Sequence, residues 1–141
     1  MGAHSAMTRA FNAELQARCG ITVTDFEVLR RLGTAEGGLM RRVDIATAVG
    51  LTPSGVTRLL DGLESAGLVR KEHCSSDARV TYAKITPEGT ALLATALDTH
   101  LAGLDAVFAG LFSGDEVATL IDLLGRLPGA EEGVATCPGG E

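Results

Sequence analysis

The side chains best suited to contact a partner lie close together in the segment 52–58. Ser54 and Thr57 carry hydroxyl groups, and Arg58 carries a long cation. Small hydrogen-bonding groups allow a helix to enter the major groove of DNA, where serine and threonine can bond base edges or phosphates and arginine can bond guanine. Taken without their surroundings, Ser54 and Thr57 could equally be ordinary solvated residues.

A second polar group occupies the stretch 73–79. Asp77 and Arg79 are two positions apart, so the carboxylate can hold the guanidinium in one pose. An arginine presented on a loop suits a narrow minor groove, where the negative potential is enhanced. The alternative is a surface ion pair worth less than about 1 kcal/mol. The further residues expected to contact DNA are Arg42, Thr52 and Lys71.

A helix over residues 52–66 is predicted to position the first group. Thr52 can cap it, Pro53 suits the first helical position, and Gly67 suits the left-handed residue after its end. Its expected inner face consists of Val56, Leu59, Leu60 and Leu63. These positions follow helical spacing, so the hydroxyls and Arg58 point outward.

A shorter helix is predicted just before it, over residues 42–49. Its apolar residues, three positions apart, are Val43, Ala46 and Val49. Residues 50–51 then turn the chain, and two short helices joined by a short turn with glycine form a helix-turn-helix. Arg42 could reach a phosphate from the start of this helix, or simply be solvated.

Two strands are predicted after the second helix, over residues 68–72 and 80–85. A short hairpin in this place is a wing, and its loop would carry Asp77 and Arg79. The predicted fold is therefore mainly α with a small β-wing, a winged helix-turn-helix.

The run from Thr22 to Thr90 resembles the MarR family of winged-helix transcription regulators. The matching motifs are Asp44-Ile45-Ala46, the segment from Thr52 to Arg58, Leu63-Glu64, Gly67-Leu68-Val69, Asp77-Ala78-Arg79 and the segment from Ile85 to Gly89. The resemblance implies a homodimer that reads a palindromic operator, with Ser54, Thr57 and Arg58 in the major groove and Arg79 in the minor groove. It also implies a small aromatic effector, for which Phe26 is the expected cleft residue, although Phe26 is at least as consistent with a core position.

Helices are also predicted on both sides of this region. Residues 1–6 are expected to be frayed, and a short helix follows over 7–20. A capping box of Thr24 and Glu27 is expected to start the next helix, which should stop at Gly33. A long apolar helix from residue 87 and a last helix ending near residue 128 would pair with the first helix as dimerisation elements. The sequence thus predicts one domain over 1–128, with its DNA-binding lobe at 22–90 and a disordered tail at 129–141.

Charge is the main objection to a DNA-binding function, since the chain has a net charge of −6. However, residues 39–87 contain seven basic and five acidic residues, a net of +2, which leaves −8 for the remainder. The basic part coincides with the predicted DNA-binding lobe. A winged-helix protein-interaction module without DNA binding is the alternative that the overall charge favours.

No set of residues predicts catalysis, a metal site or a cofactor. The cysteines, at positions 19, 74 and 137, form no Cys-x-x-Cys pair, and their odd number indicates a reducing cytoplasm. The sequence has no expected membrane span. Cys74 lies near Arg70, Lys71 and His73, which could lower its pKa and make the wing redox-responsive; the alternative is a space-filling cysteine at the base of the hairpin.

Overall fold

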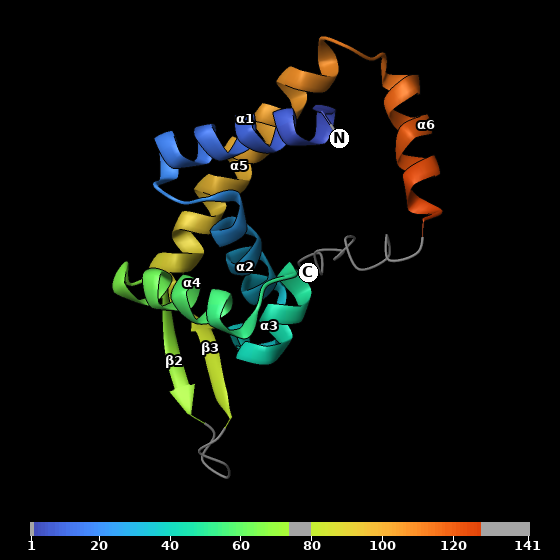
Figure 1. Cartoon of the computed structure of the whole chain (residues 1–141). Helices are drawn as coiled ribbons and strands as arrows, with labels where there is room; N and C mark the ends of the chain where they lie inside the picture. Colours follow the sequence, from blue (N-terminus) through green and yellow to red (C-terminus); the bar gives the residue numbers. More distant parts are fainter. Residues whose placement is uncertain (1, 74–79, 128–141) are drawn as a thin grey trace, which may run out of the picture. The chain divides into compact units, whose positions relative to one another are not determined.

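The computed structural model describes residues 2–73 and 80–127, and it is mainly helical with one small antiparallel sheet (Figure 1). The elements are α1 (Gly2–Cys19), α2 (Val23–Thr34), the 3-10 turn η1 (Glu36–Gly38), β1 (Leu39–Arg41), α3 (Arg42–Val49), α4 (Pro53–Ser65), β2 (Val69–His73), β3 (Thr81–Ile85), α5 (Pro87–Ala109) and α6 (Gly114–Gly125). The predicted fold class is confirmed. The chain divides into two compact units, residues 1–100 and 101–141, with the boundary inside α5.

The sheet has the strand order β1-β3-β2, so β3 lies between the other two strands. Lys71 of β2 is paired with Ala83 of β3, and Met40 of β1 is paired with the same residue from the other side. The two wing strands begin one residue later than the sequence predicted. The hairpin directly follows α4, as a wing requires.

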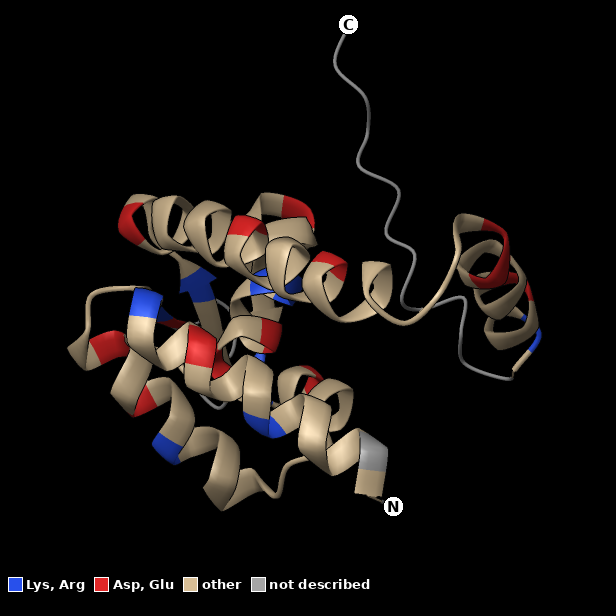
Figure 2. Cartoon of the chain, turned by 90° about the horizontal axis from the view of Figure 1, so that it is seen from above, with Lys and Arg blue, Asp and Glu red and all other residues tan. Residues whose placement is uncertain are grey.

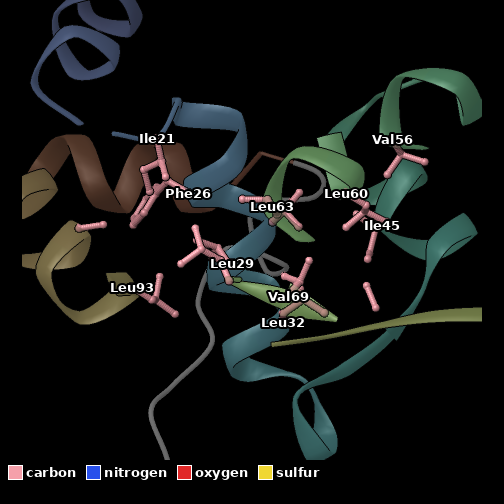
Figure 3. Packing of buried hydrophobic residues seen from close by; sticks show 14 of the residues in the cluster. Ile21, Phe26, Leu29, Leu32, Ile45, Val56, Leu60, Leu63, Val69 and Leu93 are labelled. Atoms are coloured by element: carbon pink, nitrogen blue, oxygen red, sulfur yellow. The ribbon is translucent and has the colours of Figure 1, made fainter. Parts of the chain in front are cut away.

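The core of the first unit is built around α2 (Figure 3). Val28, Leu29 and Leu32 have no exposed surface, and they are packed with apolar residues of α3, α4, β2 and α5. The predicted inner face of α4 is confirmed by Val56, Leu60 and Leu63, which are buried, while Leu59 is half-buried.

The apolar residues of α3 that follow helical spacing do not all face the core, because Val43 is 62% exposed. Ile45 and Ala46 face the core instead. Val43 lines a surface hollow of about 290 Å³ together with residues of the turn and the start of α4. Val43 therefore lies at the surface where α3 meets the start of α4, and it does not belong to the core.

The predicted starts of the first two helices are also wrong. Residues 1–6 were expected to be frayed, but α1 begins at Gly2 and runs for 18 residues. The capping box of α2 is formed by Thr22 and Asp25, not by Thr24 and Glu27: the Thr22 hydroxyl accepts from the Asp25 N–H at 3.1 Å, and Asp25 Oδ2 accepts from the Thr22 N–H at 2.9 Å. Glu27 instead binds two arginines on its own helix.

His100 of α5 lies between aromatic residues of α1 and α2. Its ring centroid is 4.9 Å from that of Phe11 and 5.1 Å from that of Phe26. Its Nδ1 atom is buried and has no partner in the described part of the chain. Burial lowers the pKa of His100 below its usual 6.5, the charge of Arg30 lowers it further, and the carboxylates of Glu14 and Glu27 act in the opposite direction.

This arrangement predicts a loss of stability at acid pH. Because the pKa of His100 is lower in the folded than in the unfolded protein, the unfolded state binds the proton first, and stability falls as the pH drops through the unfolded value until the folded imidazole is also protonated. Urea unfolding at about pH 7.5 and about pH 5.5 measures the change. His100→Phe should lose less stability than the wild type over this range, and equal losses would contradict the prediction.

Candidate nucleic-acid interface

The helix α4 is fixed at both ends by local hydrogen bonds. The Thr52 hydroxyl accepts from the Gly55 N–H at 3.1 Å, and Pro53 occupies the first helical position. At the other end Gly67 has φ +74, and the N–H of Leu68 donates to the carbonyl of Leu63 at 2.9 Å. Both predicted end signals are confirmed, and they set which residues of α4 face outward.

A tight turn joins α3 to α4. Gly50 adopts φ +66, a left-handed conformation that glycine accepts without a steric penalty. The N–H of Leu51 then donates to the carbonyl of Ala46 at 2.9 Å. This turn gives α3 and α4 the connection expected of a helix-turn-helix.

The outward face of α4 carries the predicted hydroxyls and cation. Ser54 and Arg58 are exposed, and Thr57 is half-buried. The Thr57 hydroxyl donates to the carbonyl of Pro53 at 2.8 Å, so its remaining lone pair can accept a hydrogen bond from a partner. Ser54 Oγ lies 3.2 Å from the Thr52 hydroxyl, which orients it at the start of the helix.

The basic residues around α4 differ in whether an acidic residue already holds them. Arg41 binds Asp44, Arg70 binds Glu72, and Lys71 binds both Asp61 and Glu64. Among the residues that the structure describes, no carboxylate forms an ion pair with Arg42 or Arg58. These two guanidinium groups are therefore the described cations best placed to accept a new anionic or base partner.

The helices α5 and α6 carry acidic residues and no lysine or arginine (Figure 2). The segment 87–125, which contains α5 and α6, has six acidic residues and no lysine or arginine. Negative charge in these helices would repel phosphates, whereas Arg58 on the outward face of α4 has no ion pair with any described residue. The excess of negative charge in the sequence thus lies partly on α5 and α6, which are separate from the helix-turn-helix.

Comparison with known protein families and solved structures identifies proteins similar to this chain. The model of the MarR family matches residues 21–81, which span α2, the helix-turn-helix and most of the wing. The structure of AbsC, a MarR family transcriptional regulator from Streptomyces coelicolor, is similar with a TM-score of 0.77 and 29% identity, over 93% of this chain and 88% of that one. Residues 21–81 therefore match the MarR family, and the fold is similar to that of a MarR family transcriptional regulator.

Two further proteins are similar to this chain. The HTH-type transcriptional repressor YetL of Bacillus subtilis strain 168 is 30% identical over 108 residues, which is 77% of this chain and 64% of that protein. A cysteine-to-serine mutant of MarR from E. coli, solved in complex with operator DNA, has a TM-score of 0.74 and 26% identity, over 87% of this chain and 86% of that one.

Several predicted site residues have a different setting from the one expected. Phe26 is only 4% exposed and belongs to the core, the alternative that the sequence left open. Lys71 is bound by two carboxylates, which the sequence did not indicate. Asp77, Arg79 and Cys74 lie outside the described residues, so their roles in the wing stay predictions.

Within the described ranges, no three His, Cys, Asp or Glu residues are grouped as metal ligands would be.

The ion pairs that Lys71 forms with Asp61 and Glu64 could not be predicted from helical spacing alone. Asp61 and Glu64 lie one turn apart on α4, and Lys71 follows after the turn and the start of β2. The Lys71 ammonium lies 2.6 Å from Asp61 Oδ1 and 2.9 Å from Glu64 Oε2. These hydrogen bonds raise the pKa of Lys71, and those from Lys71 lower the pKa of Glu64.

Proposed function

We propose that this protein is a sequence-specific regulator of the MarR family that binds double-stranded DNA in the cytoplasm and acts as a ligand-responsive repressor. The observation that carries the proposal is the exposed face of α4, where Arg58 is unpaired among the described residues next to Ser54 and Thr57. Two relatives support it: YetL is named a repressor, and the E. coli MarR mutant was solved with operator DNA.

Each residue of the face has a proposed contact. Arg58, Ser54 and Thr57 read base edges in the major groove, with Thr57 as an acceptor because its proton is engaged by its own helix. Thr52 and Arg42 bind phosphates, which positions α4 without reading sequence. In the wing, Asp77 orients Arg79 toward the minor groove.

The regulator is proposed to act as a homodimer. In the second unit, large apolar side chains are exposed on the described part of α5 and α6 and on the residues next to them. They are Leu101, Leu111, Phe112, Ile121, Leu123, Leu124 and Leu127, with exposed fractions between 44% and 70%. A groove of about 360 Å³ runs between the two helices. Contiguous apolar surface of this kind marks an interface with another protein.

The proposed dimer surface includes part of α5, the only long apolar helix among the described residues. α5 is long and apolar enough to span a bilayer by composition, with a mean hydropathy of 1.3. Burial against a second copy gives its exposed leucines a partner without a membrane. A homodimer also supplies the two recognition helices that a palindromic operator requires.

Ile121→Asp tests the dimer. Ile121 is 67% exposed in the single chain and lines the groove of the second unit. An aspartate buried in an apolar interface would lack a partner, so the variant should sediment as a monomer at concentrations where the wild type is a dimer. Ala118→Asp, at an exposed position of the same helix that lines neither of its apolar hollows, is the control and should remain dimeric. Identical sedimentation of the wild type and Ile121→Asp would contradict this interface.

Selection of bound duplexes from a random pool tests the function as a whole. The proposal predicts a consensus with twofold symmetry, bound with affinity that falls as salt rises, because phosphate contacts release counterions. The alternative, an interaction module without DNA binding, is motivated by the net charge of −6 and predicts no salt-dependent binding to any duplex. Unchanged DNA binding after peroxide treatment would rule out a redox role for Cys74.

A further inference from the structure

Lys71 lies where the wing meets the recognition helix. Its ammonium contacts Asp61 and Glu64 of α4, and its backbone N–H also donates to Glu64 Oε1 at 3.2 Å. Three hydrogen bonds therefore connect one residue of β2 to the last turns of α4. An exposed ion pair contributes little to stability, so the main consequence of this contact is its effect on neighbouring charged side chains.

Asp61 has a second possible partner on its own helix. Arg58 and Asp61 are three positions apart on α4, and residues at this spacing are neighbours on a helix surface, where aspartate and arginine attract each other. In the structure Asp61 binds Lys71, and Arg58 has no ion pair within the described ranges. Glu64 is six positions from Arg58, a separation that places it on another side of the helix.

We propose that Lys71 is a positioning residue that holds Asp61 away from Arg58 and so keeps the Arg58 guanidinium free to contact DNA. The inference rests on the proposed function of Arg58. Without Lys71, Asp61 would pair with Arg58 along the helix, and DNA would have to compete with that carboxylate. Lys71 thus affects DNA binding through Arg58 and does not contact a phosphate itself.

The proposal is tested by a set of variants bound to the duplex selected by the wild-type protein. Lys71→Gln should weaken binding about three- to fivefold, less than the loss of the arginine contact itself, because DNA would then compete with a weak, exposed ion pair. Adding Asp61→Asn should restore binding to within about twofold of the wild type, because Arg58 is released. In an Arg58→Ala background, Lys71→Gln should have almost no further effect.

Glu64→Gln provides the matched control. It removes one negative charge from the same cluster, but Glu64 cannot pair with Arg58. The combination Lys71→Gln and Glu64→Gln should therefore bind as weakly as Lys71→Gln alone. Equal rescue by Asp61→Asn and Glu64→Gln would show a general charge effect and overturn the proposal. A salt slope reduced by about one in Lys71→Gln, with no rescue by Asp61→Asn, would show direct phosphate contact and also overturn it.

A measurement without DNA separates this proposal from the proposed function. The Nε–H signal of Arg58 in nuclear magnetic resonance spectra reports whether its guanidinium is paired. It should shift in Lys71→Gln and return to the wild-type position when Asp61→Asn is added. If the wild type binds no duplex, the proposed function fails, and the Arg58 signal still decides the proposal: no shift in Lys71→Gln would overturn it.

Discussion

Gly89→Ala is expected to destabilise the protein by at least about 3 kcal/mol, the upper end of what overpacking normally costs. A Cβ atom at position 89 would lie 2.1 Å from the carbonyl oxygen of Leu68 and 2.9 Å from Cγ1 of Ile85. The first of these is a backbone atom, so rotating a side chain cannot relieve the contact. α5 would have to move away from the turn that follows α4.

The neighbouring hydrogen bonds explain why that movement is costly. The Thr86 hydroxyl donates to the carbonyl of Gly67 at 2.7 Å and accepts from the N–H of Gly89 at 3.0 Å, and the N–H of Thr86 donates to the carbonyl of Leu68 at 3.1 Å. One residue therefore caps α5 and joins it to the end of α4. Displacing α5 would break these bonds while Gly89 itself is buried.

Urea unfolding measures this loss. Gly62→Ala is the control, since a Cβ atom there would meet nothing within 4 Å and Gly62 lies inside a helix. That variant should gain about 0.5–1 kcal/mol from the higher helix propensity of alanine. A Gly89→Ala protein as stable as the wild type would show that α5 is not held this closely.

Arg58→Ala is expected to weaken binding to the selected duplex by about 1–3 kcal/mol and to relax sequence preference at the contacted base pair. The exposed guanidinium lies on the outward face of α4 without an ion pair among the described residues, so no internal bond has to break before it contacts a base. The fold should remain intact, because Arg58 is exposed and is not part of the hydrophobic core formed by the described residues.

Arg70→Ala is the control for overall charge. It removes the same charge from the wing, but Arg70 is already held by Glu72 through hydrogen bonds of 3.0 and 2.6 Å. Fluorescence anisotropy at several salt concentrations should show the larger loss for Arg58→Ala. Equal losses would indicate that only net charge matters, and α4 would then not be the element that reads sequence.

The helix-turn-helix could be predicted because its signals are local. Thr52, Pro53 and Gly67 determine the ends of α4 by bonds within a few residues, and Gly50 does the same for the turn. The start of α2 was ambiguous from the sequence, because Thr22 and Thr24 both precede an acidic residue by three positions. In the structure Thr22 is the N-cap. The N–H of Val23 also donates to Asn12 of α1 at 3.1 Å, a contact that spacing does not show.

Contacts between elements were less predictable. Gly33 suggested a helix end, but α2 continues through it to Thr34, and a Cβ atom there would lie 2.7 Å from Leu93 Cδ2. The absence of a side chain thus serves close packing with α5. Lys71 was expected to contact DNA, whereas its bonds to α4 depend on how the wing packs against that helix. Local sequence patterns predict where a helix or strand lies. The contacts of Gly33 and Lys71 depend instead on the other elements that pack against them.

Replacing purines in the selected duplex with 7-deazapurines tests whether α4 reads the major groove. This change removes the N7 acceptor, which faces the major groove, and leaves base pairing intact. Wild-type protein should bind the substituted half-sites more weakly, and Arg58→Ala should be much less sensitive to the change. Equal wild-type affinity for natural and substituted duplexes would contradict the claim.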